Sequence, residues 1–345
     1  MLLNAFDVDP GAAERTVELQ WGELFQLGIQ ADLLVISAWE GVYTPVPGTL
    51  VQRLAQACNL DVGTLPRELD LTQSHVGAWI SPPLQQLAEP MCWPAGTSTR
   101  FSRLAVVESP RLAGSGPWPV FSQLFSLLAL LPLQNIHCPV VATPLLSAGN
   151  QGIAAKRLFP ALLNSCRNGF RHVPDLQRLI VFDRRREALD DLALQIDQEL
   201  GRFAAERERV HLLPSDKAIV RLRGVLSGFC QRHPELAVQG DVAELHALIS
   251  EGPATAMALG MHSRRLVERM VVQRLGWERG TLYRGIQELS RRNLNPWIIS
   301  CLHQVRVFGN WMGHPSRPGE RRAVQPSDLT AMLTALLRVL DDYPW

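Results

Sequence analysis

Hydrophobic and polar residues alternate in two different ways along this chain, and the change between them divides it into two parts. In the first part, short apolar runs are separated by stretches whose apolar residues recur at helical spacing. The runs lie at 17–21, 33–36, 104–107, 140–145 and 179–182, and the helical stretches at 50–58, 121–131, 154–169 and 187–200. Strands and helices that alternate in this order predict an α/β layer fold whose apolar strands are covered on both faces.

The second part has only the helical pattern. Apolar residues recur at helical spacing over 219–229, 242–249, 254–275, 282–292, 296–309 and 328–340. Asn295 before Pro296 predicts a helix start with a first-turn proline, and Ser327 is predicted to cap the last helix. The pattern changes near residues 201–216, so we predict an α/β domain over 1–205 and an all-α domain over 206–345.

Composition narrows the class of protein. The chain has 345 residues and a formal net charge of +1, divided into −4 over residues 1–205 and +5 over residues 206–345. Near-neutral charge argues against a dedicated duplex-DNA binder, because phosphate contacts dominate that affinity. The six cysteines are scattered without paired spacing, and the longest apolar stretch, 124–133, is too short to span a bilayer. We therefore expect a cytoplasmic protein with no metal site, no cofactor and no membrane partner.

A glycine-punctuated turn follows the apolar run at 140–145. Glycine allows backbone angles closed to other residues, and free amides at a turn and at a helix start can point at one anion. A plain turn is the alternative for such glycines. The candidate phosphate-binding residues of this turn are Ser147, Ala148, Gly149, Asn150, Gln151 and Gly152.

With the apolar runs at 33–36 and 179–182, this turn resembles the second loop of the macro domain, an ADP-ribose-binding module. The resemblance covers roughly the first two hundred residues and implies an α/β/α domain with a mixed sheet. It implies that Asp32, just before a central strand, contacts the adenine amino group. It also implies that residues 41–48 form the first diphosphate loop and that Phe182 flanks the adenine. ADP-ribose or a derivative is the ligand it implies.

The chain departs from hydrolytic macro domains in one motif. These carry an Asn-Ala-Ala-Asn run after the strand, where this chain reads Ile36-Ser37-Ala38-Trp39, and its first loop is less glycine-rich. The departures favour a pocket that binds a nucleotide without cleaving it. Trp39 or Tyr43 would then meet an extra group of an ADP-ribose variant, or would simply pack the loop.

The late helix carries a second candidate site. At 100° per residue, His303, Arg306, Asn310 and His314 fall within about 80° of one another around a helix axis. With the helix around 263–268, this ridge resembles HEPN-like domains, in which an arginine holds the scissile phosphate, a histidine moves protons and two protomers share the site. The candidate catalytic residues are thus Arg306, Asn310 and His314, although Arg306-x7-His314 is longer than the usual nuclease spacing. The alternative is that Asn310 and His314 cap the helix and Arg306 forms an ion pair.

Together the two resemblances imply a sensor-effector. An ADP-ribose-type signal would bind the macro-like domain, and a dimeric HEPN-like domain would act, as a metal-independent ribonuclease on single-stranded RNA, in the manner of bacterial antiphage defence effectors. A homodimer or higher oligomer is expected. Two alternatives remain open: an ADP-ribosyl hydrolase, and a non-catalytic ADP-ribose-binding module whose helical domain dimerises it.

Overall fold

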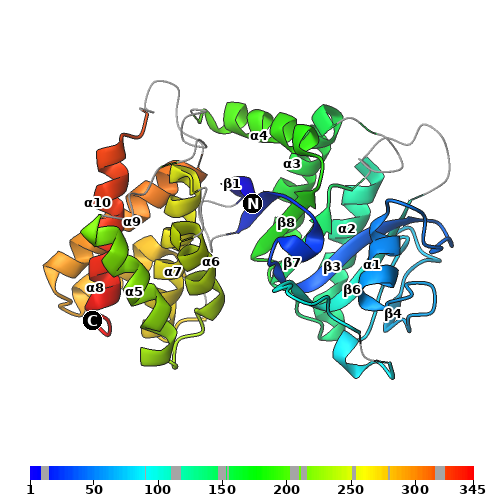
Figure 1. Cartoon of the computed structure of the whole chain (residues 1–345), viewed down its shortest axis with the longest axis horizontal. Coiled ribbons are helices and arrows are strands. Elements are labelled where there is room, and N and C mark those ends of the chain that lie inside the picture. The colour runs from blue at the N-terminus through cyan, green and yellow to red at the C-terminus, as the bar shows by residue number, and fades with distance from the viewer. Residues whose placement is uncertain are drawn as a thin grey trace. The chain divides into compact units, whose positions relative to one another are not determined.

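The fold consists of two units, each with its own core (Figure 1). The computed structural model describes residues 1–8, 15–89, 91–109, 118–146, 153, 155–202, 210, 216–250, 254–278, 280–314 and 323–345. The first unit comprises Met1–Leu3 and Arg15–Gln195, and the second Asn4–Glu14 and Ile196–Trp345. The predicted class, α/β followed by all-α, is confirmed. The division falls ten residues before the predicted boundary, and the second unit also takes residues 4–14.

The strands form one mixed sheet in the order β1-β2-β8-β7-β3-β6-β5-β4. Neighbours from β2 to β6 are parallel, whereas β5 runs antiparallel to both β6 and β4. The strands are β1 (Leu2–Asp7), β2 (Thr16–Trp21), β3 (Gln30–Trp39), β4 (Leu69–Asp70), β5 (Ala78–Ile80), β6 (Arg100–Ser109), β7 (Val140–Pro144) and β8 (Arg178–Asp183). All five apolar runs lie in strands, as predicted.

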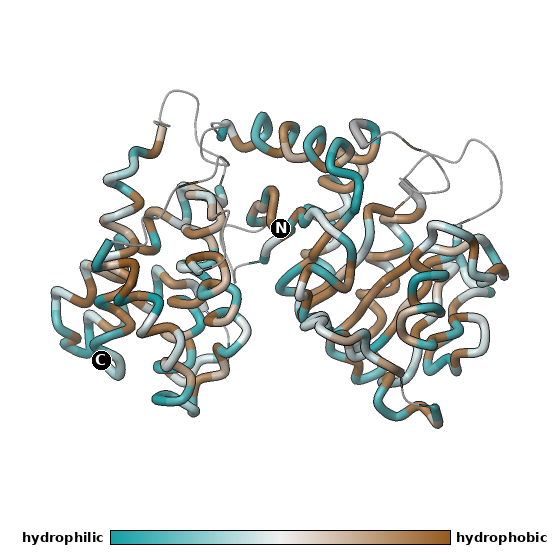
Figure 2. Tube along the Cα trace, viewed as in Figure 1, coloured by the Kyte–Doolittle hydropathy of each residue, from teal (hydrophilic) through white to brown (hydrophobic). Residues whose placement is uncertain are grey.

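Both faces of the sheet are buried. Leu34 and Ile36 of β3 share a core cluster with Leu54 of α1, and the alternate residues Leu33 and Val35, which point to the other face, are also inaccessible to solvent. Figure 2 shows hydrophobic colour along the central strands. The helices of this unit are α1 (Leu50–Cys58), α2 (Trp118–Leu130), α3 (Ala155–His172) and α4 (Arg186–Leu200), with 3-10 turns at Leu24–Gln26, Leu84–Gln86 and Leu131–Gln134.

The chain leaves β3 and β7 in opposite directions across the sheet. These strands are parallel neighbours, with Leu33 opposite Val141. After β3 the chain passes through α1 to β4, β5 and β6 on one side, and after β7 it passes through α3 to β8 on the other. The carboxyl ends of β3 and β7 are therefore a topological switch point, where open α/β sheets bind ligands.

The second unit is built on helices. They are α5 (Lys217–Arg232), α6 (Gln239–Ser250), α7 (Ala256–Arg274), α8 (Leu282–Arg291), α9 (Pro296–Gly313) and α10 (Pro326–Asp341), and all six were predicted. Helices α7 and α9 cross closely, because a Cβ on Gly309 would lie 2.4 Å from the Arg264 Cβ and 2.9 Å from the Gly260 carbonyl oxygen. No helix in the described part of the chain combines the length and apolar composition needed to cross a membrane.

Two helix starts test the capping predictions. The Asn295 side chain accepts the Trp297 N–H at 2.9 Å, so the predicted cap before Pro296 is confirmed. The prediction for Ser327 is wrong. Helix α10 starts at Pro326, and Gln325 is the cap, whose N–H donates to Asp328 at 2.9 Å. Pro326 at the first position places the cap at Gln325, two residues before Ser327, and leaves Ser327 inside the first turn.

Candidate functional site

The carboxyl edge of the sheet holds most residues of the candidate nucleotide site. Strand β3 ends at Trp39 and β7 at Pro144, so the first loop and the predicted phosphate loop both start at this edge. Residues Ser147 to Gly152 lie outside the described residues. Just before them, Leu145 and Leu146 are buried, and the Leu145 N–H donates to the Phe182 carbonyl of β8 at 2.9 Å.

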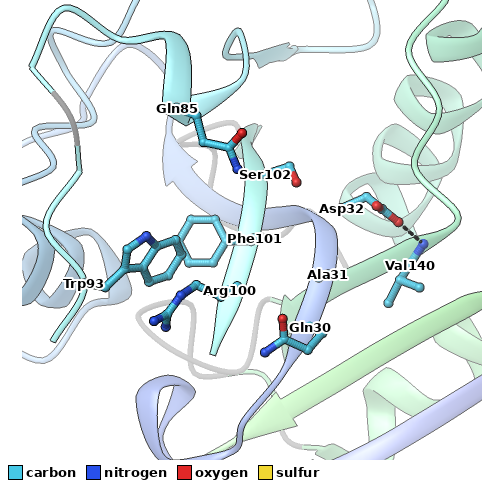
Figure 3. A pocket seen from close by; sticks show the side chains of 9 residues that line it. All are labelled: Gln30, Ala31, Asp32, Gln85, Trp93, Arg100, Phe101, Ser102 and Val140. Atoms are coloured by element: carbon cyan, nitrogen blue, oxygen red, sulfur yellow. Dashed lines mark hydrogen bonds between the residues drawn. The ribbon is translucent and has the colours of Figure 1, made fainter. Parts of the chain in front are cut away.

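Asp32 lies at the opposite, amino edge (Figure 3). Its Oδ2 accepts the N–H of Val140, the first residue of β7, at 2.8 Å. Asp32 and Trp39 are seven positions apart along β3, about 23 Å at the rise of a strand. The expectation that Asp32 and the phosphate loop hold the same ligand is therefore wrong. The sequence places an acid before the strand, and the direction of the strand puts it at the far edge.

A separate pocket surrounds Asp32. Its volume is about 510 Å³, and it is lined by Gln30, Ala31, Asp32, Gln85, Trp93, Arg100, Phe101, Ser102 and Val140 (Figure 3). The Arg100 guanidinium lies 4.7 Å from the Trp93 ring centroid, and the Phe101 ring meets Trp93 edge-on at 5.0 Å. Burial raises the pKa of Asp32, and the hydrogen bond from Val140 opposes that change.

Phe182 is not available to stack on a base. It is only 5% exposed and belongs to the core cluster of Leu24, Ile36 and Leu54. Its predicted role as the adenine-flanking aromatic is corrected to core packing. The position at the end of β8 was predicted correctly, but the side chain points into the hydrophobic layer beneath the edge.

Trp39 and Tyr43 fix the start of the first loop. The Trp39 carbonyl accepts the Val42 N–H at 2.8 Å, which closes a tight turn. The Tyr43 hydroxyl donates to the Glu108 carboxylate, and its ring meets Trp79 edge-on at 5.9 Å. Burial and the bond to Glu108 raise the pKa of Tyr43. These contacts are those of a residue that packs the loop.

An aromatic and basic cluster at the carboxyl edge was missed by the sequence reasoning. The Trp21 ring is 36% exposed, its indole N–H donates to the Arg184 carbonyl at 3.0 Å, and the Arg186 guanidinium lies 5.0 Å from its centroid. The Arg184 side chain reaches the first loop, because a Cβ on Gly48 would lie 3.5 Å from its Nη2. No acid among the described residues pairs with Arg184. One acid and three arginines follow a predicted strand at residues 183–186, and this was the sequence feature that could have indicated the cluster.

In the helical unit, the structure places the predicted ridge on α9 and at its end. Arg306 lies with its Nε 3.4 Å from His303 Nδ1 and its guanidinium 5.2 Å from the Tyr283 ring centroid. Burial, together with the nearby Arg264, lowers the pKa of Arg306. Within the described ranges no carboxylate pairs with Arg306, so the ion pair of the structural alternative is not found there.

His314 caps α9 and joins a charged cluster. Its N–H donates to the Asn310 carbonyl at 2.9 Å, as the capping alternative expected, and the Asn310 Oδ1 is buried without a partner in the described part. Arg264 Nη1 lies 3.0 Å from His314 Nε2 and 2.9 Å from Asp7 Oδ2, which is 3.4 Å from His314 Nδ1. An arginine donates only, so Nε2 accepts and the ring is neutral, with its proton on Nδ1 facing Asp7.

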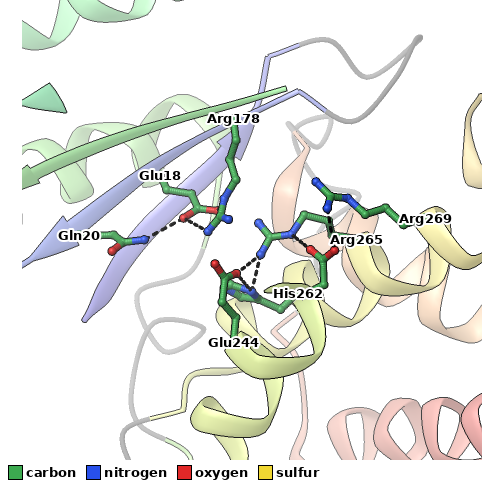
Figure 4. A network of polar contacts seen from close by, with 8 residues as sticks. Glu18, Gln20, Arg178, Glu244, His262, Arg265 and Arg269 are labelled. Atoms are coloured by element: carbon green, nitrogen blue, oxygen red, sulfur yellow. Dashed lines mark hydrogen bonds and ion pairs between the residues drawn. The ribbon is translucent and has the colours of Figure 1, made fainter. Parts of the chain in front are cut away.

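Other buried or partly buried arginines are paired with acids (Figure 4). In the helical unit, Arg265 Nε lies 2.8 Å and Arg269 Nη1 2.9 Å from the carboxylate of Asp241. In the sheet, Arg178 forms a two-pronged pair with Glu18 at 2.7 and 2.9 Å. We interpret charge pairs of this kind as part of the fold and not as ligand-binding sites. Arg306 differs from these residues because the described part of the chain brings it a histidine, a tyrosine ring and another arginine, and no acid.

Neither a metal site nor a disulfide is formed by the residues that the structure describes. No group of three or more histidine, cysteine or acidic side chains is arranged to hold an ion there. All six cysteines are free thiols, and burial raises the pKa of both Cys58 and Cys138 to about 12. Reactive cysteines have a lowered pKa, so these two thiols have none of that character.

Comparisons with known proteins find relatives for each half. Residues 243–342 match the family described as DUF4145, a domain of unknown function. No curated protein matches the chain. Over the N-terminal half, the similar solved structures are macrodomains, the family that the sequence resembles.

Three of these structures show the extent of the likeness. The Trypanosoma brucei macrodomain in complex with ADP-ribose has TM-score 0.39 and 14% identity, covering 55% of this chain and 74% of that one. The Oceanobacillus iheyensis macrodomain with ADP has TM-score 0.39 and 11% identity, covering 53% and 91%. Thermosipho africanus DarTG in complex with ADP-ribose has TM-score 0.37 and 12% identity, covering 56% and 47%. At these scores the likeness says nothing about the ligand of this chain.

Proposed function

We propose that the first unit binds ADP-ribose or a close derivative at the carboxyl edge of β3 and β7. The observation that carries the proposal is the Arg184 guanidinium, which has no acid partner among the described residues and reaches Gly48 of the first loop at the topological switch point. A guanidinium without an acid partner suits a diphosphate. The partly exposed Trp21 beside it offers a surface for the base, and the amides of residues 147–152 would complete the anion site.

Binding without hydrolysis is the form of this proposal that the residues support. Ile36 is 1% exposed and packs in the core, and Trp39 closes the turn that follows. Neither residue can position a distal ribose and a water as an asparagine would, and catalysis depends on such positioning. Release of ADP-ribose from a modified protein at enzymatic rates would contradict this part.

Calorimetry on the full chain tests the binding site. Titration with ADP-ribose should give saturable binding, and Arg184→Ala should weaken it about 10- to 150-fold, the loss of a charged hydrogen bond. Arg100→Ala is the matched control, because this exposed arginine lies at the amino edge. The affinity of Arg100→Ala for ADP-ribose should equal that of the parent. Absence of binding to ADP-ribose and its derivatives would overturn the proposal.

A second function is proposed for the helical unit, that of a metal-independent ribonuclease acting on single-stranded RNA as a dimer. Arg306 favours it, since this half-buried cation beside Arg264 has no carboxylate partner among the described residues and could accept an anion. Arg306 would hold the scissile phosphate, and His314, oriented by Asp7, would move the proton. Joined in one chain, the two activities would make a nucleotide-triggered effector of the antiphage type.

Cleavage of labelled single-stranded RNA in the presence of EDTA and ADP-ribose tests this second function. His314→Ala should lower the rate about 10²- to 10⁴-fold, the usual contribution of general acid–base catalysis. Arg306→Lys should lose most activity, because lysine keeps the charge but not the two-pronged geometry. The control is Arg291→Ala, an exposed arginine on α8 whose side chain is 76% accessible. Full activity of His314→Ala would refute the assignment.

A further inference from the structure

We propose that Tyr283 of α8 is a stacking platform for one unpaired base of the RNA held by Arg306. The inference rests on the proposed ribonuclease function and adds a substrate-binding residue to it. Tyr283 is 49% exposed, so part of this aromatic side chain is open to a ligand. Its exposure next to Arg306 is what makes the ring available to a base.

The ring lies beside the candidate catalytic groups. The Arg306 guanidinium carbon is 5.2 Å from the ring centroid, and the His303 ring centroid is 6.4 Å away at an interplanar angle of 52°. Both residues lie on α9 within the same unit. A base stacked on the exposed part of the Tyr283 ring would bring its own phosphate close to Arg306, because base and phosphate are joined through a single sugar.

The backbone beneath Tyr283 is held firmly. Thr281 caps α8 by accepting the Arg284 N–H at 3.3 Å, and the Glu268 carboxylate accepts the Leu282 N–H at 3.1 Å. Leu282, next to the tyrosine, is 2% exposed. A fixed aromatic surface loses little freedom on binding, which is what a stacking platform requires.

Charge favours a nucleic acid as the occupant. Residues 282–314 hold four arginines and one acid, a net charge of +3. An acidic backbone fits this surface, and aromatic rings bind bases of any sequence by stacking. The base must be unpaired, since a base inside a duplex is already stacked on its neighbours and its faces are covered. Single-stranded RNA meets both requirements.

The test measures binding of the full chain to fluorescent 2′-O-methyl RNA decamers, which lack the free hydroxyl needed for cleavage. Tyr283→Ala should weaken binding about 5- to 150-fold, the range for loss of one stacked base. Tyr283→Phe keeps the ring and should bind as the parent does. Val220→Ala is the matched control, because Val220 is an equally exposed apolar residue on α5, at 53%.

The oligomer sequence supplies a second measure. Adenine stacks more strongly than uracil, so the parent should prefer oligo(A) to oligo(U), and Tyr283→Ala should remove most of that preference. If the parent binds RNA and Tyr283→Ala binds it equally well, the platform is disproved while the ribonuclease proposal stands. If the parent binds no RNA, both fail. If Tyr283→Ala instead changes the mass of an oligomer at unchanged RNA affinity, the exposed ring serves contact between copies and the inference is wrong.

Discussion

His314 shows how a single side chain can link folding to pH. Burial lowers its pKa from 6.5, Asp7 opposes the change and Arg264 adds to it. In the unfolded chain the ring gains a proton near its ordinary pKa, whereas in the folded chain it stays neutral to lower pH. Protonation therefore favours the unfolded state, and stability falls as the pH drops below about 6.5 toward the folded pKa.

We accordingly expect the urea midpoint of the helical unit to fall between pH 7.5 and pH 5.5, and to fall less in His314→Gln. His303, whose pKa burial and Arg306 also lower, adds to the same trend, so His303→Gln should act in the same direction. Urea titrations at several pH values check this expectation. An equal pH dependence in the parent and in His314→Gln would show that His314 is not a source of the trend.

For Asp32 we expect a substitution to have no effect on ligand binding. Because it lies at the amino edge, Asp32→Ala should leave ADP-ribose affinity unchanged, in contrast to Arg184→Ala. Calorimetry on the two variants compares them directly. Asp32 lies near the start of its strand and the phosphate loop follows the end of a parallel strand, so chain order alone places the two at opposite edges. A large loss of affinity in Asp32→Ala would place the ligand at the amino edge instead.

At the scale of elements, the sequence predicted most of the fold and less of the site. All five apolar runs and all ten helices lie where the periodicity placed them. Strands β1, β4 and β5 were not predicted. The last two have only two and three residues, too few for a periodic signal. The polar ridge of α9 was predicted from helical geometry alone, whereas Arg184 and Tyr283 depend on contacts between distant segments.

The crossing of α7 and α9 yields an element-scale prediction. Gly309→Ala should destabilise the helical unit by about 1–3 kcal/mol, because the new methyl group meets the Arg264 Cβ and the Gly260 backbone. Gly224→Ala on α5 is the matched control. No atom lies within 4 Å of its added Cβ, so the substitution should stabilise by roughly 0.5–1 kcal/mol through helix propensity. Calorimetric melting of the full chain compares the two, and equal melting temperatures would contradict the close crossing.

At the scale of the whole molecule, the boundary between the units determines which fragments of the chain keep all the contacts of the helical unit. A fragment of residues 206–345 lacks Arg202, whose guanidinium donates to the Ala5 carbonyl at 2.7 Å and to the Met312 carbonyl. It also lacks Asp7. We expect this fragment to melt at a lower temperature than the helical unit in the full chain, or to aggregate. Circular dichroism measures this, and an unchanged melting temperature would show that residues 4–7 contribute nothing.

Assembly is the other prediction at this scale. If two protomers share the ribonuclease site, light scattering should give twice the 38.4 kDa of one chain. Mixing Arg306→Ala with His314→Ala should then restore part of the cleavage that each lacks alone. Arg306→Ala alone, at the same total protein concentration, is the control. A monomer mass at working concentrations, with no restoration, would confine the site to one protomer.

The pairing of Asp7 with Arg264 and His314 also bears on when this charged cluster can form during synthesis of the chain. Asp7 and Arg264 are 257 residues apart, and His314 follows later still. A ribosome adds about 5–20 residues per second, so about 13 to 50 s pass between the synthesis of Asp7 and that of Arg264. By the end of that interval all the strands of the sheet have been synthesised, whereas α9 and His314 have not. A ribonuclease completed in this order would be inert while its own messenger is being translated.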